Sequence, residues 1–459
     1  MKFPSLLIFI FGALAAEVSA AEKPNIILIM ADDLGIEGLS CYGGESYETP
    51  HLDRMAAEGM QFTQAYSQPL CTPTRLQIMT GLYNQRNWLY FGILPKDQRT
   101  FGHLMQELGY TTGIFGKWQL TSYDPPDYPG SKKRRGTGMH PKNAGFDEYA
   151  LFHAEETEDK GSRYADPTYL HDGTLVKEVK GKYGEDISVD LLLDFMQRKK
   201  DGDQPMFIYY PMALPHWPVN PTPDSSDWTD PARRLDEDEK YFPDMVAYMD
   251  KLVGRIIQEV DAMGLGENTL ILFYSDNGTD RKVTSRIGGM DLQGGKNQVT
   301  QNGIRVPLVA RWKGTIEPGR ESSQLIDASD FLPTLAHLAG GDLTGNWQTD
   351  GLSFAPALLG REGRERDWCF FWYDPRPGWD KDQFTRHIFA LDDTHKLYED
   401  GTLVALSGPG KLVEDALTEP LSPADEIAKR KLEAVIEQMM QPPLSKAALT
   451  PADEFGHPE

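Results

Sequence analysis

The stretch Asn25-Ile26-Ile27-Leu28-Ile29-Met30-Ala31-Asp32-Asp33 contains a continuous apolar run that ends in two adjacent carboxylates. An uninterrupted run rich in branched residues predicts a strand buried on both faces, as in a parallel sheet. In open α/β sheets, ligands bind outside the carboxyl ends of the strands, which is where Asp32 and Asp33 fall. Neighbouring carboxylates repel each other unless a cation compensates them, although an isolated pair more often forms a turn or a helix cap.

Three later segments repeat this order of a buried strand followed by polar residues. They are Tyr110–Phe115 before Gly116-Lys117-Trp118-Gln119, Pro205–Tyr210 before Pro215-His216-Trp217-Pro218, and Asn268–Tyr274 before Ser275-Asp276-Asn277-Gly278. Apolar spacing predicts helices at 185–199 and 243–263, and residues 49–66 are predicted to form a helix and its exit. The alternation indicates an α/β fold with a mostly parallel sheet covered by helices on both faces.

The sequence pattern changes near residue 366, which divides the chain into a large domain at 21–365 and a C-terminal subdomain at 366–459. A closing helix is predicted from Ser422-Pro423, a cap and a first-turn proline, to about Met440. Short strands, which predict a small antiparallel sheet, lie at Trp368–Tyr373, His387–Leu391 and Lys396–Tyr398.

The chain is acidic and poor in cysteine. Its 459 residues carry 46 Lys and Arg against 69 Asp and Glu, a net charge of −23. Such a surface repels nucleic acid and anionic membranes, so an anionic substrate requires a local cluster of positive groups. The basic run 132–135 is expected to be a solvated loop rather than that cluster. Three cysteines exclude a disulfide-built fold, and whether Cys41 pairs with Cys369 stays open.

The first 20 residues are typical of a secretory signal. Lys2 precedes an apolar core, and Val18-Ser19-Ala20 supplies the small residues of a cleavage site. The apolar run is too short to span a bilayer comfortably, and no later stretch is a better candidate, although an uncleaved anchor is the rival interpretation. We therefore expect a periplasmic or secreted protein without a membrane span.

The segment Cys71-Thr72-Pro73-Thr74-Arg75 carries the most specific chemistry in the chain. A helix is predicted to begin near Arg75, which places Cys71 at or just before its amino terminus. That end of a helix attracts anions through free backbone N–H groups and the helix dipole. Alone, a cysteine in this short pattern is more often a buried structural thiol.

The strand ends and their loops supply a set of polar groups suited to an anionic substrate. The set comprises the oxygen-bearing Asp32, Asp33, Asp276 and Asn277, the cations Arg75, Lys117 and Lys296, the titratable His216, and Cys71. All-oxygen ligation suits calcium or magnesium better than zinc. A metal and fixed cations would neutralise a dianionic group during attack, and histidine or lysine could assist a departing oxygen.

Together these segments resemble the arylsulfatase-like, formylglycine-dependent sulfatases of the alkaline phosphatase superfamily, from about Lys23 to Gly360. The matching motifs also include Gly145-Phe146-Asp147 and Gly303-Ile304-Arg305-Val306-Pro307. The resemblance implies an alkaline-phosphatase-like α/β core with a small C-terminal sheet. It also implies that a formylglycine-generating enzyme oxidises Cys71 to formylglycine, and that a calcium ion is bound by Asp32, Asp33, Cys71, Asp276 and Asn277.

The resemblance also implies a reaction, the hydrolysis of a sulfate ester of a small molecule or a glycan. One hydroxyl of the hydrated aldehyde at position 71 attacks sulfur, and the second later expels sulfate. His216 and Lys296 assist the leaving alcohol, while Arg75 and Lys117 orient the modified residue. The resemblance further implies that the substrate is contacted by Lys117, Gln119, His216 and Lys296.

Two departures from the family pattern leave alternatives open. Gln119 stands where the family usually has a histidine, and Gln301-Asn302-Gly303 replaces a Glu-Gly-Gly. Glutamine cannot take a proton near neutral pH, so the step that expels sulfate is altered or lost. The alternatives are a phosphate or phosphonate ester hydrolase on the same scaffold, a phosphatase that uses unmodified Cys71, or an inactive relative that binds anions.

Overall fold

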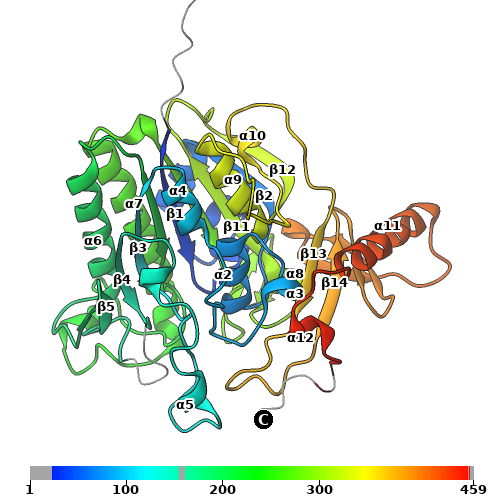
Figure 1. Cartoon of the computed structure of the whole chain (residues 1–459), viewed down its shortest axis with the longest axis horizontal. Coiled ribbons are helices and arrows are strands. Elements are labelled where there is room, and N and C mark those ends of the chain that lie inside the picture. The colour runs from blue at the N-terminus through cyan, green and yellow to red at the C-terminus, as the bar shows by residue number, and fades with distance from the viewer. Residues whose placement is uncertain (1–22, 155–160, 453, 455–459) are drawn as a thin grey trace, which may run out of the picture.

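The computed structural model describes residues 23–154, 161–452 and 454. The predicted signal at 1–20 lies outside these residues. A ten-stranded sheet forms the centre, in the order β12-β2-β11-β8-β1-β7-β3-β4-β5-β6 (Figure 1). Its strands are β1 (Asn25–Ala31), β2 (Met60–Tyr66), β3 (Thr111–Lys117), β4 (Glu148–Phe152), β5 (Tyr169–His171), β6 (Thr174–Val176), β7 (Met206–Pro211), β8 (Thr269–Ser275), β11 (Arg305–Arg311) and β12 (Arg320–Asp327).

The central strands are parallel, as the sequence predicts. Strand β1 pairs in parallel with β7 and β8, and β3 pairs in parallel with β7 and β4. Strand β11 instead runs antiparallel to both β8 and β2. Alternate side chains of β1 enter different hydrophobic clusters, Ile26 and Leu28 on one face and Ile27 and Ile29 on the other, so the continuous apolar run is buried on both faces.

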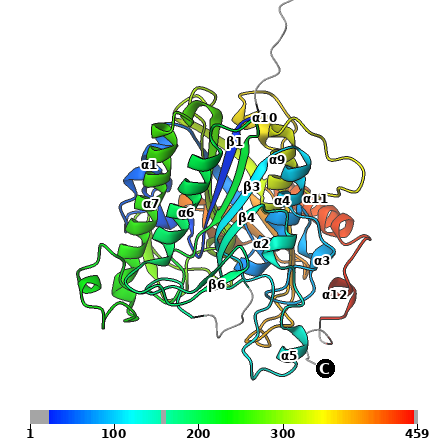
Figure 2. The same cartoon turned by 60° about the vertical axis from the view of Figure 1, so that its left-hand side comes forward.

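Helices cover both faces of this sheet (Figure 2). One face packs against α1 (Pro50–Ala57), α6 (Gly184–Lys199) and α7 (Phe242–Ala262). The other packs against α2 (Cys71–Thr80), α4 (Phe101–Glu107) and α9 (Phe331–Leu338). Shorter elements are α3 (Asn84–Asn87), α5 (Ser131–Arg134), α8 (Gln301–Ile304), α10 (Ala355–Leu358) and the hairpin β9 (Thr284–Ile287) and β10 (Met290–Gln293). No helix among the described residues is long and apolar enough to cross a membrane.

The sequence predicts that residues 49–66 form a helix and its exit, and this prediction is wrong for residues 60–66. Helix α1 ends at Ala57, and Met60–Tyr66 forms strand β2 between β11 and β12. Two buried amide side chains hide this strand, because they interrupt its apolar pattern. One of them, Gln64, donates from Nε2 to the Ser323 carbonyl oxygen at 2.9 Å.

A second, five-stranded antiparallel sheet follows the large one. The three predicted strands are confirmed and two more extend them, in the order β13 (Cys369–Tyr373), β14 (His387–Leu391), β15 (His395–Tyr398), β16 (Leu403–Ser407) and β17 (Val413–Ala416). The predicted closing helix is α11 (Pro423–Met439), capped by the Ser422 hydroxyl, and the last short helix is α12 (Lys446–Leu449). Cys41 and Cys369 are not paired, and Cys71 is also free.

The basic run at 132–135 lies largely within the short helix α5 rather than in an irregular loop. Lys132 and Lys133 are exposed, while the Arg134 guanidinium bonds to Asp124 at 2.6 Å. The two lysines are therefore solvated, as the sequence predicts for the run.

We predict that Arg366→Ala, at the junction of the two sheets, lowers the free energy of unfolding by about 3–5 kcal/mol. Arg366 is buried against Asp330, with Nε 3.0 Å from Oδ2, and donates to the Tyr83 hydroxyl at 2.8 Å. Removing the guanidinium leaves a buried carboxylate unpaired. Urea denaturation measures the loss. The exposed Arg361→Ala serves as the control, with a change within about 0.5 kcal/mol; equal small effects of the two substitutions would contradict the prediction.

Candidate active site

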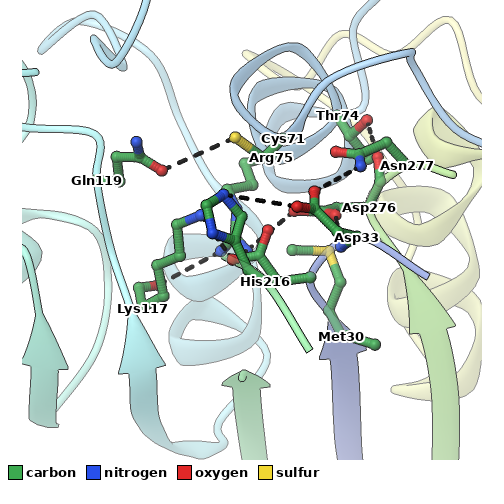
Figure 3. Close-up of polar contacts among 12 residues, drawn as sticks. Met30, Asp33, Cys71, Thr74, Arg75, Lys117, Gln119, His216, Asp276 and Asn277 are labelled. Carbon is green, nitrogen blue, oxygen red and sulfur yellow. Dashed lines mark hydrogen bonds and ion pairs between the residues drawn. The ribbon is translucent and has the colours of Figure 1, made fainter. Parts of the chain in front are cut away.

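The predicted site residues meet at the carboxyl edge of the large sheet (Figure 3). Because β1 and β8 are parallel with Ala31 opposite Ser275, the turns that follow them lie side by side. The Asp33 backbone N–H donates to Asp276 Oδ1 at 3.1 Å. The two acidic turns therefore form one structure and not two separate caps.

Strand β3 brings Lys117 to the same edge. A Cβ atom on Gly116, whose φ is +125°, would lie 2.2 Å from the Pro211 carbonyl oxygen. Only glycine allows the end of β3 to approach β7 this closely. Lys117 then extends to Asp32, with Nζ 2.6 Å from Oδ2.

Helix α2 supplies the nucleophile candidate and a second cation. Cys71 is its first residue, as the sequence predicts, and every residue of the helix is buried. The Thr74 hydroxyl donates to the Asp276 carbonyl oxygen at 2.6 Å, which fixes the helix start against the turn after β8. Arg75 then lies with Nη2 3.1 Å from Asp276 Oδ2.

Lys296 completes the cations from the loop after β10. Its backbone N–H donates to the Thr279 carbonyl oxygen at 3.0 Å, and its Nζ lies 2.5 Å from Asp33 Oδ2. Further along this loop, the Val299 carbonyl oxygen accepts a hydrogen bond from Lys396 of the C-terminal sheet. Lys396 also pairs with Glu414 at 2.9 Å, although burial lowers the pKa of Lys396 to about 8.

The nearby cations stabilise the ionised forms of Asp32, Asp33 and Asp276 to different extents. Burial opposes ionisation of Asp32, but the Lys117 ammonium and other nearby cations outweigh it and hold the pKa of Asp32 well below its usual range. Burial, reinforced by the charge of Asp32, raises the pKa of Asp33 and of Asp276. The protein cations alone thus favour full ionisation of only part of the set, which suits a further cation.

The donor set fits a hard metal ion. Asp32 Oδ1 and Asn277 Oδ1 are buried without a hydrogen-bond partner among the described residues. Asp32, Cys71 and Asp276 each offer one ligand atom within 4.8 Å of the others. Buried oxygens of this kind normally have partners, so these two are suited to coordinate a cation such as calcium.

Cys71 is only 4% exposed, and burial raises the pKa of its thiol despite the nearby Lys117. A buried thiol with a raised pKa is a poor nucleophile, because the thiolate is the reactive form. Its Sγ donates to Gln119 Oε1 at 3.8 Å. Gln119 follows β3 in a left-handed turn, with φ +59°, that directs its amide at position 71.

His216 lies in the loop after β7, between Pro215 and Pro218. Its Nε2 is 3.2 Å from Lys296 Nζ and 3.7 Å from Asp33 Oδ2. Burial and the Lys296 charge lower the pKa of His216 well below its usual range. The Tyr164 hydroxyl donates to the His216 carbonyl oxygen at 2.7 Å and positions this loop.

A cavity of about 610 Å³ lies in front of these groups and is lined by Cys71, Gln119, His216 and Lys296. It is also lined by Arg163, which the sequence analysis missed because no strand end or motif marks it. Arg163 Nη1 lies 3.0 Å from His216 Nδ1. The structure thus brings every predicted site residue into one cluster and adds a further cation to its cavity.

Comparison with known proteins identifies the family. A family model named Sulfatase matches residues 24–341. The chain belongs to the sulfatase family. Human arylsulfatase A is 32% identical over 379 residues, which cover 78% of this chain and 72% of the relative. Bovine arylsulfatase A is 31% identical over 497 residues, which cover 97% and 92%. N-acetylgalactosamine-6-sulfatase of Canis lupus familiaris is 29% identical over 86% of this chain and 77% of the relative.

Solved structures share the sulfatase fold. The complex of Ps i-CgsB with k-i-k-neocarrahexaose has a TM-score of 0.69 at 24% identity and covers 91% of each chain. The phosphonate monoester hydrolase of Agrobacterium radiobacter has a TM-score of 0.64 at 19% identity, over 91% of this chain and 96% of that one. The fold is therefore alkaline-phosphatase-like. The sulfatase relatives make this chain a sulfuric ester hydrolase.

For this sulfatase we predict that Lys117→Met lowers kcat/KM on p-nitrophenyl sulfate by about 10²–10³-fold, the loss typical of one preorganised electrostatic group. The substitution keeps the length of the side chain and removes the ammonium closest to Asp32. Initial rates measure the loss. Lys313→Met, which removes a charge from an exposed residue between β11 and β12, is the control; equal rates of the two variants would count against the assignment.

Proposed function

We propose that this sulfatase hydrolyses sulfate esters of a sulfated glycan through a formylglycine at position 71 and a calcium ion. The observation that carries the proposal is the position of Cys71, which is buried at the start of α2 and contacts Gln119 beside three cations and three carboxylates. Its raised thiol pKa disfavours direct thiolate attack. Conversion by a formylglycine-generating enzyme would place hydroxyl groups at the same point.

The glycan substrate class is supported by the relatives. One is named N-acetylgalactosamine-6-sulfatase. One solved structure of the same fold is described in complex with its substrate D-glucosamine-2-N,6-O-disulfate, and another with a neocarrahexaose. A cavity of about 610 Å³ falls in the range of pockets that enclose small organic ligands, so a sugar residue fits its size.

Calcium would be held by Asp32, Asp33, Asp276, Asn277 and the converted residue 71. When bound, it would supply positive charge beside the sulfate and polarise a coordinated oxygen. The two unpartnered oxygens and the raised pKa values of Asp33 and Asp276 support this assignment. Arg75 and Lys117, both buried against these carboxylates, would orient residue 71 and bind sulfate oxygens.

Departure of the alcohol requires a proton or a hydrogen bond at the leaving oxygen. Lys296 Nζ and His216 Nε2 lie 3.2 Å apart and both line the cavity, so they are the groups positioned to supply it. After attack, the hydrated aldehyde supplies the second hydroxyl that a serine ester would lack. Gln119 can hydrogen-bond to that hydroxyl but cannot accept its proton, which must pass to another group or to water.

A phosphate or phosphonate ester hydrolase on this scaffold is the second candidate. The fold likeness to a phosphonate monoester hydrolase supports it at the level of architecture. The ratio of turnover on aryl sulfate to turnover on aryl phosphate separates the two candidates, and we expect it to exceed one. A phosphatase that uses unmodified Cys71 is disfavoured by burial of the thiol.

Export is a further part of the proposal. It rests on the pattern of residues 1–20, with a basic start, an apolar core and small residues at the cleavage position. We propose a periplasmic or secreted enzyme. The intact mass of the mature chain, which would lack this segment, tests the proposal.

For the matured protein we expect the peptide that contains Cys71 to be about 18 Da lighter than its unmodified form, the mass difference between CH₂SH and CHO. It should also react with a hydrazide reagent, because the product is an aldehyde. Peptide mass spectrometry of protein co-expressed with a maturing enzyme measures both. Cys71→Ala should show neither, and an unmodified thiol in the matured protein with full activity would exclude the mechanism.

For the metal we expect Asp276→Asn to lower calcium affinity by at least about 100-fold, because loss of a charged direct ligand should cost no less than loss of a contact to a ligand. The substitution removes a buried charged oxygen from the donor set. Calorimetric titration with calcium and elemental analysis of the dialysed protein give readouts independent of activity. The exposed Asp342→Asn is the matched control; unchanged affinity in Asp276→Asn would remove Asp276 from the ligands.

A further inference from the structure

The cavity contains a guanidinium that has no carboxylate partner within the part of the chain described here. Arg163 is half-buried and lines the cavity, with its guanidinium carbon 4.9 Å from the centre of the Phe152 ring. Its polar contact is with His216, at 3.0 Å. Half-buried arginines usually pair with an anion, so the cavity offers a binding position for one.

The side chain of His216 lies between Arg163 and the groups that surround Cys71. Arg163 contacts Nδ1 of His216, whereas Nε2, on the other side of the ring, faces Lys296 and Asp33. The imidazole therefore separates Arg163 from the catalytic cluster. An anion held by Arg163 is a second group of the substrate, distinct from the ester that is cleaved.

A second cation enters the same cavity from the C-terminal part of the chain. Lys381, between β13 and β14, lines the cavity and is 7% exposed. Its Nζ lies 4.4 Å from the centre of the Phe91 ring and 5.5 Å from that of Tyr123. The ammonium also donates to the Asp380 carbonyl oxygen at 3.2 Å. Phe91 and Tyr123, which attract it by cation–π interaction, themselves line the cavity.

We propose that the outer cavity is a subsite for a second anionic substituent, a sulfate or a carboxylate, bound by Arg163, while the Lys381 ammonium adds positive charge to the same cavity. The substrate class is then a doubly anionic sugar of a polyanionic glycan. This deepens the proposed function and rests on it. Three acidic residues, Glu237, Asp280 and Asp380, also line the cavity, and the chain carries a net charge of −23. An anionic group therefore needs a cation at its own binding position, which Arg163 provides.

Calorimetry with the full, unconverted chain tests the subsite without interference from turnover. The probes are N-acetylgalactosamine 6-sulfate, the same sugar with a second sulfate at position 4, and its disaccharide with glucuronate. We expect at least one doubly anionic probe to bind about tenfold more tightly, the lower end for hydrogen bonds to charged groups. Comparison of the disulfated sugar with the glucuronate disaccharide shows whether the subsite prefers a sulfate or a carboxylate.

Arg163→Gln should reduce this preference about tenfold, while the exposed Arg281→Gln, which makes the same change in net charge, should keep it. If Arg163 only orients His216, the substitution will change the affinities of all probes by one factor and leave the preference intact. That result, or equal or absent binding of all probes by the unsubstituted chain, overturns the proposal. Turnover of p-nitrophenyl sulfate by the matured chain is measured separately, so a failure of the proposed function is recognised by itself.

Discussion

The burial of three carboxylates at one edge of the sheet is the constraint on which the site depends. Asp32, Asp33 and Asp276 are each 0% exposed. A buried charge is costly unless it is paired, so strand β3, helix α2 and the loop after β10 must each deliver a cation to this edge. The positions of Lys117, Arg75 and Lys296 are therefore required for the stability of the fold, as well as for the site that we propose.

Much of this arrangement follows from the sequence alone. Parallel strands end at one edge, so the carboxylate pair after β1 and Asp276-Asn277 after β8 were expected at the same edge, and the pairing of β1 with β8 brings them into contact. Cys71 at the first turn of α2 likewise follows from the helix signal that begins near it. In each case a local pattern and one rule of sheet geometry were sufficient.

Features that depend on distant contacts were not predictable. Strand β2 was missed because its two buried amides break its apolar pattern, and the contact of Gln64 with the neighbouring strand cannot be read from the sequence. Strand β11 runs antiparallel to both of its neighbours, β2 and β8, and its own residues carry no signal of that direction. Arg163 reaches the cavity because the next residue, Tyr164, bonds to the carbonyl oxygens of Ala213 and His216, contacts between segments about 50 positions apart.

The hydrogen bond from Lys396 to the Val299 carbonyl oxygen connects the small C-terminal sheet to the active-site edge of the large sheet. It ties β15 to the loop that carries Lys296, three positions before Val299. Glu414 of β17 accepts a hydrogen bond from the N–H of Gln301, the first residue of α8, which follows this loop. The two sheets are therefore not interchangeable modules. A chimera that takes its carboxyl-terminal sheet from a relative must keep this lysine and glutamate, or the segment that carries Lys296 loses two of its anchors.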